Sequence, residues 1–132
     1  MKIWKYSENS ANKKADFYIQ SHGFHAGRPL KIPKRNCFAV KSDNPNAYEI
    51  VFCLFKGRAF KNLIIGSVIP FIRKREIEVI IKEAVTANFE ERHLMKVRLI
   101  ENCIINLQKQ LETLNKLHID YAYTLYRNSI KK

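Results

Sequence analysis

The chain has 132 residues, of which 46% are hydrophobic, and it carries a formal net charge of +12. This length suits a single domain over residues 1–132, and the apolar content favours a packed core over a disordered chain. The longest uncharged apolar run, residues 62–72, is too short to cross a bilayer, which takes about 20 such residues. Basic residues near the start precede no apolar stretch, so we expect a cytoplasmic protein without a membrane partner.

Most of the positive charge lies in the middle of the chain. Residues 17–75 contain eleven Lys and Arg but two acidic residues, whereas residues 76–132 contain nine basic and eight acidic residues. This asymmetry favours a polyanionic partner for the basic part and a packing role for the nearly neutral part. Nucleic acid, DNA or RNA, is the partner we expect first, and an acidic protein is the alternative.

The first predicted element is a helix over residues 10–22. Ser10 can cap it, apolar side chains recur at helical spacing, and Gly23 ends it. Residues 23–35 then form a stiff, irregular loop, because each of its two prolines lacks an amide donor.

Residues 36–41 predict a short strand with Phe38 and Val40 on one face. The next segment, residues 44–57, has helix signals at both ends, with Asn44 as cap and Gly57 past the end. Its run YEIVFCLF is also rich in β-forming residues, so a hairpin with the preceding strand is the alternative. We favour the helix.

A buried extended segment and a helix follow. Residues 62–72 are almost all apolar, and their stretch 64–70 is predicted to pair with residues 36–41 in a small two-strand element. Residues 73–88 predict a helix, because isoleucines and small apolar residues recur on one face.

An apolar seam predicts a long helix near residues 90–117. Its members repeat with alternating steps of three and four, and they are Val97, Ile100, Ile104, Leu107, Leu111, Leu114, His118, Tyr121 and Leu125. Few complementary charges flank this seam, so we favour an intramolecular helical hairpin or bundle over a homodimer through residues 97–125. A break at residues 118–120 would let Asp120 cap a short final helix. The fold class expected is α+β, mostly helical.

Three clusters of basic side chains are the candidate nucleic-acid-binding residues. They are Arg28, Lys31, Lys34 and Arg35; Lys56, Arg58 and Lys61; and Arg73, Lys74 and Arg75. On one shared face they would hold phosphates without reading sequence. Four nearby rings are candidates for stacking on bases: Phe24, His25, Tyr48 and Phe60.

Part of the first cluster resembles the core of AT-hook peptides. In those peptides an Arg-Gly-Arg-Pro core lies along the minor groove with both arginines on its floor. Here Ala26 takes the place of the first arginine, before Gly27-Arg28-Pro29, so the paired grip is lost. We expect a packed loop instead, anchored by Phe24, Leu30 and Ile32.

No pattern in the sequence predicts a catalytic residue, a metal site or a cofactor. His22, His25 and Cys37 have a spacing that could share a metal, but they lack a second His pair or a Cys-x-x-Cys pair. The other cysteines, Cys53 and Cys103, also lie in apolar runs, as reduced thiols do. Without a Walker A loop or a dinucleotide glycine pattern, an enzyme is the least favoured interpretation.

The stretches GRPLKIP (residues 27–33) and GSVIPFI (residues 66–72), each followed by a predicted helix, resemble a family of uncharacterised small proteins of Bacteroidetes. Phe60 precedes the second stretch. Members of that family often accompany mobile or conjugative DNA. The resemblance implies a bacterial, cytoplasmic, mobile-element setting and brings no activity with it.

Overall fold

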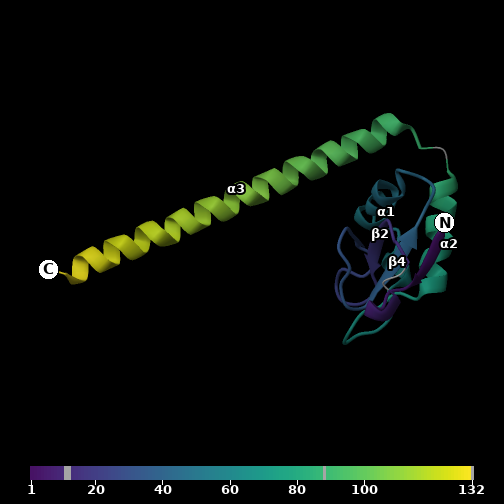
Figure 1. Ribbon diagram of the computed structural model, residues 1–132, viewed down its shortest axis with the longest axis horizontal. Helices are drawn as coiled ribbons and strands as arrows, with labels where there is room; N and C mark the ends of the chain where they lie inside the picture. The colour runs from purple at the N-terminus through teal and green to yellow at the C-terminus, as the bar shows by residue number, and fades with distance from the viewer. Residues whose placement is uncertain (11–12, 88, 132) are drawn as a thin grey trace. The chain divides into compact units, whose positions relative to one another are not determined.

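The computed structural model describes residues 1–10, 13–87 and 89–131. The chain divides into two compact units, Met1–Leu94 and Met95–Lys132. The first unit contains an antiparallel sheet with two helices, and the second is the greater part of one long helix (Figure 1). Among the described residues, no helix combines the length and the apolar content that crossing a bilayer requires.

The sheet has four strands in the order β1-β4-β2-β3. The elements in chain order are β1 (Lys2–Lys5), η1 (Glu8–Ser10), β2 (Phe17–Gln20), β3 (Pro29–Leu30), β4 (Cys37–Lys41), α1 (Ala47–Lys56), η2 (Lys61–Leu63), α2 (Lys74–Thr86) and α3 (Glu91–Ile130). The predicted α+β class, mostly helical with a long C-terminal helix, is confirmed.

One face of the sheet forms the core of the first unit. Val40 of β4 lies opposite Ile3 of β1 and Phe17 of β2, so apolar side chains line up across three strands. Ile77 and Ile81 of α2 are fully buried in the same cluster, which α1 also joins. The prediction that Phe38 shares this face with Val40 is confirmed, because strand residues two apart point the same way.

The helix predicted over residues 10–22 is wrong where the structure describes it. Residues 17–20 form β2, a central strand, and residues 11 and 12 lie outside the described residues. Phe17 and Ile19 are buried while Tyr18 and Gln20 are half-buried, which is the period of two of a strand. Four residues are too few for this period to stand out against the helical spacing of their neighbours.

The predicted pairing of residues 36–41 with residues 64–70 is also wrong. Residues 37–41 do form β4, but its neighbours are β1 and β2 rather than residues 64–70. Ile65 and Phe71 form one isolated bridge that closes a loop around Gly66, whose φ is 99°. The helices predicted within residues 44–57 and 73–88 are confirmed as α1 and α2, with Asn88 outside the described residues.

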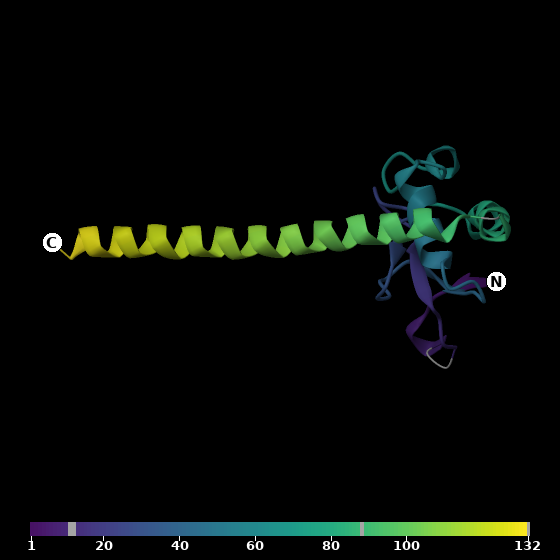
Figure 2. The ribbon, with the colours of Figure 1, turned by 90° about the horizontal axis from the view of Figure 1, so that it is seen from above.

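Helix α3 is longer than predicted and unbroken (Figure 2). Its sequence has no Gly or Pro that would end it, and Asp120 lies inside it rather than at a cap. Within the described part of the second unit, no other helix packs beside α3 to make the predicted intramolecular hairpin or bundle. The second unit contains this helix alone, and its seam side chains, such as Leu107 and Leu114, are exposed.

Asp16 ties the start of β2 to the end of β4. Its carboxylate accepts hydrogen bonds from Lys41 Nζ at 2.6 Å and from the Ser42 amide at 2.8 Å. These two bonds, that from Lys41 first, hold the pKa of Asp16 below its ordinary value. A lowered folded pKa gives stability that is complete above the unfolded pKa, about 3.9, and is lost as the pH falls through the folded value.

We therefore expect Asp16→Asn to lower the free energy of unfolding at pH 7 by about 0.5 kcal/mol, since the pair is partly exposed. The difference from the wild type should shrink as the pH falls through the folded pKa of Asp16. Urea denaturation at pH 7 and in acid measures both values. A difference that stays undiminished in acid would contradict this role.

Candidate nucleic-acid interface

The ten predicted basic residues are spread over several surfaces. Lys34 and Arg35 line one pocket together with Glu8 and Tyr6. The third cluster stands at the start of α2, where Lys74 Nζ donates a 3.4 Å hydrogen bond to the Ile3 carbonyl and lies 4.0 Å from the Glu78 carboxylate. The structure therefore does not gather all three clusters into one pocket.

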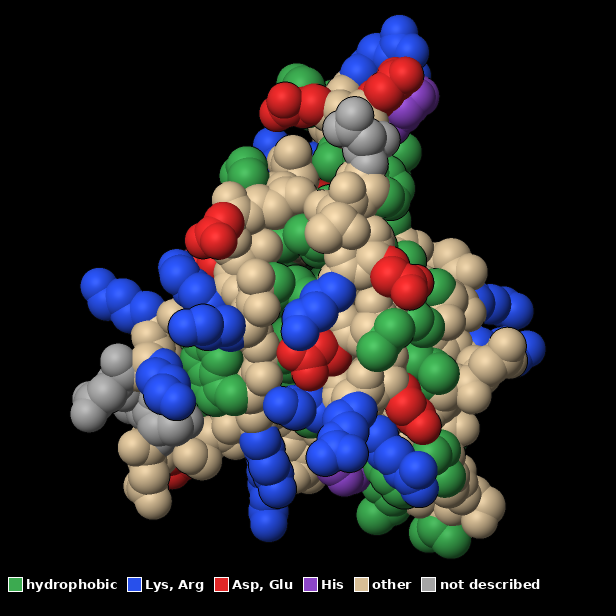
Figure 3. Space-filling model, turned by 90° about the vertical axis from the view of Figure 1, so that its right-hand side faces the viewer, with side chains coloured by type: hydrophobic (Ala, Val, Ile, Leu, Met, Phe, Trp, Pro, Cys, Tyr) green, Lys and Arg blue, Asp and Glu red, His purple; other side chains and the backbone are tan. Residues whose placement is uncertain are grey.

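A second basic pocket, which the sequence analysis did not predict, lies on the face of the first unit that carries β1 and α2. Lys and Arg side chains gather on this face, with Asp and Glu side chains between them (Figure 3). This lysine pocket, about 590 Å³, is lined by Met1, Lys2, Ile3, Trp4, Lys13, Lys14, Lys41, Glu78 and Lys82. Acids compensate part of its charge, because Lys82 lies 2.9 Å from Glu78 and Lys41 lies 2.6 Å from Asp16. Its lysines are far apart in the sequence. The pairing of β1 with β4, which sets Lys2 opposite Lys41, brings two of them together, and this pairing was not predicted.

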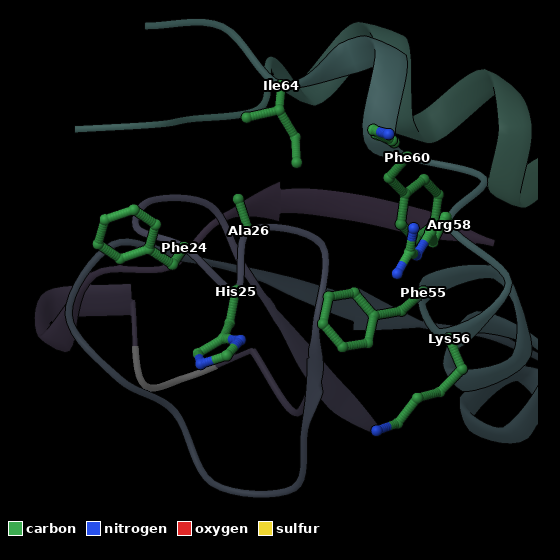
Figure 4. A pocket seen from close by; sticks show the side chains of 9 residues that line it. Phe24, His25, Ala26, Phe55, Lys56, Arg58, Phe60 and Ile64 are labelled. Carbon is green, nitrogen blue, oxygen red and sulfur yellow. The ribbon is translucent and has the colours of Figure 1, made fainter. Parts of the chain in front are cut away.

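The second predicted cluster, Lys56, Arg58 and Lys61, lines a pocket that has no acidic lining residue to compensate its positive charge. This loop pocket, about 420 Å³, is lined by Phe24, His25, Ala26, Phe55, Lys56, Arg58, Phe60, Lys61 and Ile64. Phe24 and His25 lie on the loop across the pocket from Lys56 and Arg58 (Figure 4). Its volume suits a phosphate or a nucleotide-sized group.

The three cations of the loop pocket have no acidic neighbours in it. No Asp or Glu lines the pocket, and within the described residues no ion pair engages Lys56, Arg58 or Lys61. Lys56 Nζ lies 5.7 Å from the ring centre of Phe52, which leaves its positive charge in place. The loop pocket is thus a site of uncompensated positive charge, unlike the lysine pocket.

The end of α1 presents Arg58 to this pocket. The amide of Ala59 donates to the Leu54 carbonyl at 2.9 Å, and the amide of Arg58 donates to the Phe55 carbonyl at 3.1 Å, as in a Schellman motif. Gly57 lies just past the end of the helix, as predicted, but its φ is −76° and the left-handed position falls on Arg58, with φ 60°. A side chain at such a position costs about 1–2 kcal/mol, so the arginine is held there at a cost to stability.

Replacing Arg58 by glycine should separate stability from binding. We expect Arg58→Gly to raise the free energy of unfolding by roughly 0.5–1 kcal/mol, because glycine relieves the left-handed strain but is more flexible when unfolded. The same change removes a cation from the loop pocket and should weaken the binding of polyanions. Urea denaturation followed by the fluorescence of Trp4 measures the first effect, and a loss of stability would contradict it.

The loop that faces α1 is anchored differently from the prediction. Phe24 is 90% exposed and Ile32 is also exposed, so two of the three expected anchors are wrong. Ala26 and Leu30 are buried, and the Gly27 amide donates to the Gln20 carbonyl at 2.7 Å. This bond turns the loop so that the small alanine, rather than the aromatic ring, meets the core.

The hook-like stretch is part of the sheet. Pro29 and Leu30 form β3 and pair with β2, and the Arg28 carbonyl accepts a bond from the Gln20 amide at 2.9 Å. A backbone held in this way is not free to lie along a minor groove, which agrees with the packed loop expected from Ala26.

Two of the four candidate stacking rings are available. Phe60 is 2% exposed and belongs to the core. Tyr48 packs edge-on against Phe17, and Lys31 Nζ lies 5.3 Å from its ring centre. Phe24 and His25 are exposed at the mouth of the loop pocket.

The candidate metal ligands and two of the thiols have the following surroundings. Among the described residues, no three His, Cys, Asp or Glu side chains lie together as a metal site. Burial raises the pKa of the Cys37 thiol, and burial followed by the charge of Glu49 raises that of Cys53. A raised thiol pKa keeps the sulfur protonated and disfavours nucleophilic attack.

The fold and the loop pocket define a small basic α+β protein with an uncompensated cationic pocket and a long C-terminal helix. The chain belongs to a family of unknown function, DUF6943, whose model matches residues 3–124. The predicted membership of an uncharacterised family is confirmed at this level. Comparison with curated proteins gives no match, and comparison with solved structures gives none either.

Proposed function

We propose that this chain is a non-enzymatic protein that binds nucleic acid through phosphates at the loop pocket. The observation that carries the proposal is the set of three cations, Lys56, Arg58 and Lys61, which line an open pocket without an acidic residue. Cations in this arrangement neutralise phosphates and release the counterions condensed on the strand, which favours binding at low salt.

The ring of Phe24 favours single strands over duplexes. It stands beside the cations and is 90% exposed, so its face is open to a binding partner. Bases of a single strand can stack on such a ring, whereas bases of a duplex already stack on one another. Contacts to phosphates and to ring faces carry little sequence information, so we expect weak sequence preference.

The cellular location and the genetic surroundings of the protein are part of the same proposal. The resemblance of residues 27–33 and 66–72 to proteins of Bacteroidetes suggests a bacterial cytoplasm and a place near mobile DNA. An acidic protein is the competing partner, because its carboxylates would also satisfy the charge of the loop pocket.

Binding of labelled oligonucleotides by the full chain tests the proposal. In fluorescence anisotropy at about 50 mM salt we expect binding of single-stranded DNA or RNA, with weaker binding of the matching duplex. Polyglutamate of equal charge is the control, since it offers anionic groups without bases, and it should compete poorly. No binding of any nucleic acid at this salt concentration would overturn the proposal.

A further inference from the structure

The seam of α3 is apolar and yet open to solvent. Ile100 is 61% exposed, Leu107 64% and Leu114 62%. The seam runs over residues 97–125, which is about 42 Å of helix at 1.5 Å per residue. Single exposed apolar side chains are ordinary on a protein surface, but a continuous stripe of this length indicates an interface.

A helix that covers this stripe must have a similar length. Helix α1 has 10 residues and α2 has 13, or about 15 and 20 Å, and both already place most of their apolar side chains in the core of the first unit. Among the described residues, α3 with its 40 residues is the one helix of matching length. A second copy of the chain supplies another.

Part of the seam favours a pair of parallel helices. In this heptad register the a positions are Val97, Ile104, Leu111, His118 and Leu125, and the d positions are Ile100, Leu107, Leu114 and Tyr121. β-branched residues at a with leucine at d favour parallel dimers over larger bundles. Val97 and Ile104 at a, with Leu107 and Leu114 at d, follow this combination, whereas the remaining seam positions do not.

One pair of opposite charges beside the seam favours the same orientation. Lys96 falls at a g position and Glu101 at the e position five residues later. In a parallel, in-register pair each g residue faces the e residue of the next heptad in the other helix, so Lys96 of one copy meets Glu101 of the other twice. An antiparallel pair sets g against g and e against e, and does not bring these opposite charges together.

We propose that the chain is a homodimer in which two α3 helices form a parallel, in-register coiled coil through residues 97–125. This inference depends on α3 and not on the loop pocket. It therefore stands or falls independently of nucleic-acid binding.

Light scattering on the purified full chain tests the dimer. We expect a mass of twice the 15.5 kDa of one chain. The double variant Leu107→Asp with Leu114→Asp should halve this mass, because two buried charges per helix would oppose pairing. The matched control is Leu99→Asp with Ile119→Asp, two similarly exposed residues outside the seam, and it should stay dimeric. A monomeric wild type, a larger oligomer, or equal effects of the two double variants would overturn the proposal.

Crosslinking tests the orientation. In a Cys103→Ser background, Leu107→Cys should form a disulfide between the two copies on mild oxidation, because equivalent d positions meet in a parallel, in-register pair. Leu99→Cys, which lies away from the seam, is the control and should crosslink far less. If Leu107→Cys crosslinks no more than this control while the mass is that of a dimer, the parallel register is wrong.

Discussion

Gly27→Ala is expected to lower the free energy of unfolding of the first unit by about 3 kcal/mol. The φ of Gly27 is 93°, and a side chain in this region costs about 1–2 kcal/mol. The added Cβ would also lie 2.7 Å from Cδ2 of Phe60 and 3.3 Å from Cδ1 of Ile72. Both neighbours are buried in the core and cannot yield freely, so overpacking adds about 1–3 kcal/mol.

Gly23→Ala is the matched control, because its φ is also 93°. The nearest atom to its added Cβ is the amide nitrogen of Gln20 at 3.3 Å, at the end of a flexible side chain. We expect this variant to lose only the backbone contribution, about 1–2 kcal/mol. Urea denaturation followed by the fluorescence of Trp4, the single tryptophan and part of β1, reports on the first unit for both variants. Equal losses would contradict the close contact with Phe60.

The second large effect is on binding. The triple variant Lys56→Ala, Arg58→Ala and Lys61→Ala should bind single-stranded nucleic acid about 100-fold more weakly at 0.1 M salt. Each neutralised phosphate of a single strand contributes about 0.7 to the salt exponent, and three such contacts at this concentration correspond to about two powers of ten. Anisotropy titrations of the wild type and the variant measure the loss directly.

A variant of equal charge distinguishes the loop pocket from general basicity. Lys2→Ala, Lys13→Ala and Lys14→Ala remove three positive charges from the lysine pocket, where acidic residues already compensate part of the charge. We expect this control to lose less than about 10-fold. An equal loss in both triple variants would show that only the total charge matters, and the assignment to the loop pocket would be wrong.

The helices were predictable because their signals are local. The sequence of α1 carries start and stop residues, and that of α2 carries an apolar face at helical spacing, so each helix could be predicted from its own segment. β2 was not predictable, because its four residues become a strand through pairing with β4, which lies about twenty residues later. The partner of a strand is a property of the whole fold rather than of the segment.

The candidate site was predictable as a cluster but not as a pocket. Lys56, Arg58 and Lys61 are close in sequence, whereas their position opposite the loop of His25 depends on the turn at the end of α1. The residue that anchors the loop was predicted wrongly. Phe24 is large and apolar, as buried anchors usually are, but the backbone hydrogen bonds around Gly27 turn Ala26 toward the core instead. The lysine pocket was missed because strand register assembles it from lysines that are distant in sequence.

The most direct test of nucleic-acid binding at the loop pocket is the salt dependence of the affinity, measured side by side for the wild type and the Lys56, Arg58, Lys61 triple variant. For a single strand, the slope of the logarithm of the association constant against that of the salt concentration should be shallower in the variant by about 2, which corresponds to three lost phosphate contacts. Identical slopes for the two proteins would mean that these cations touch no phosphate and would contradict the proposal.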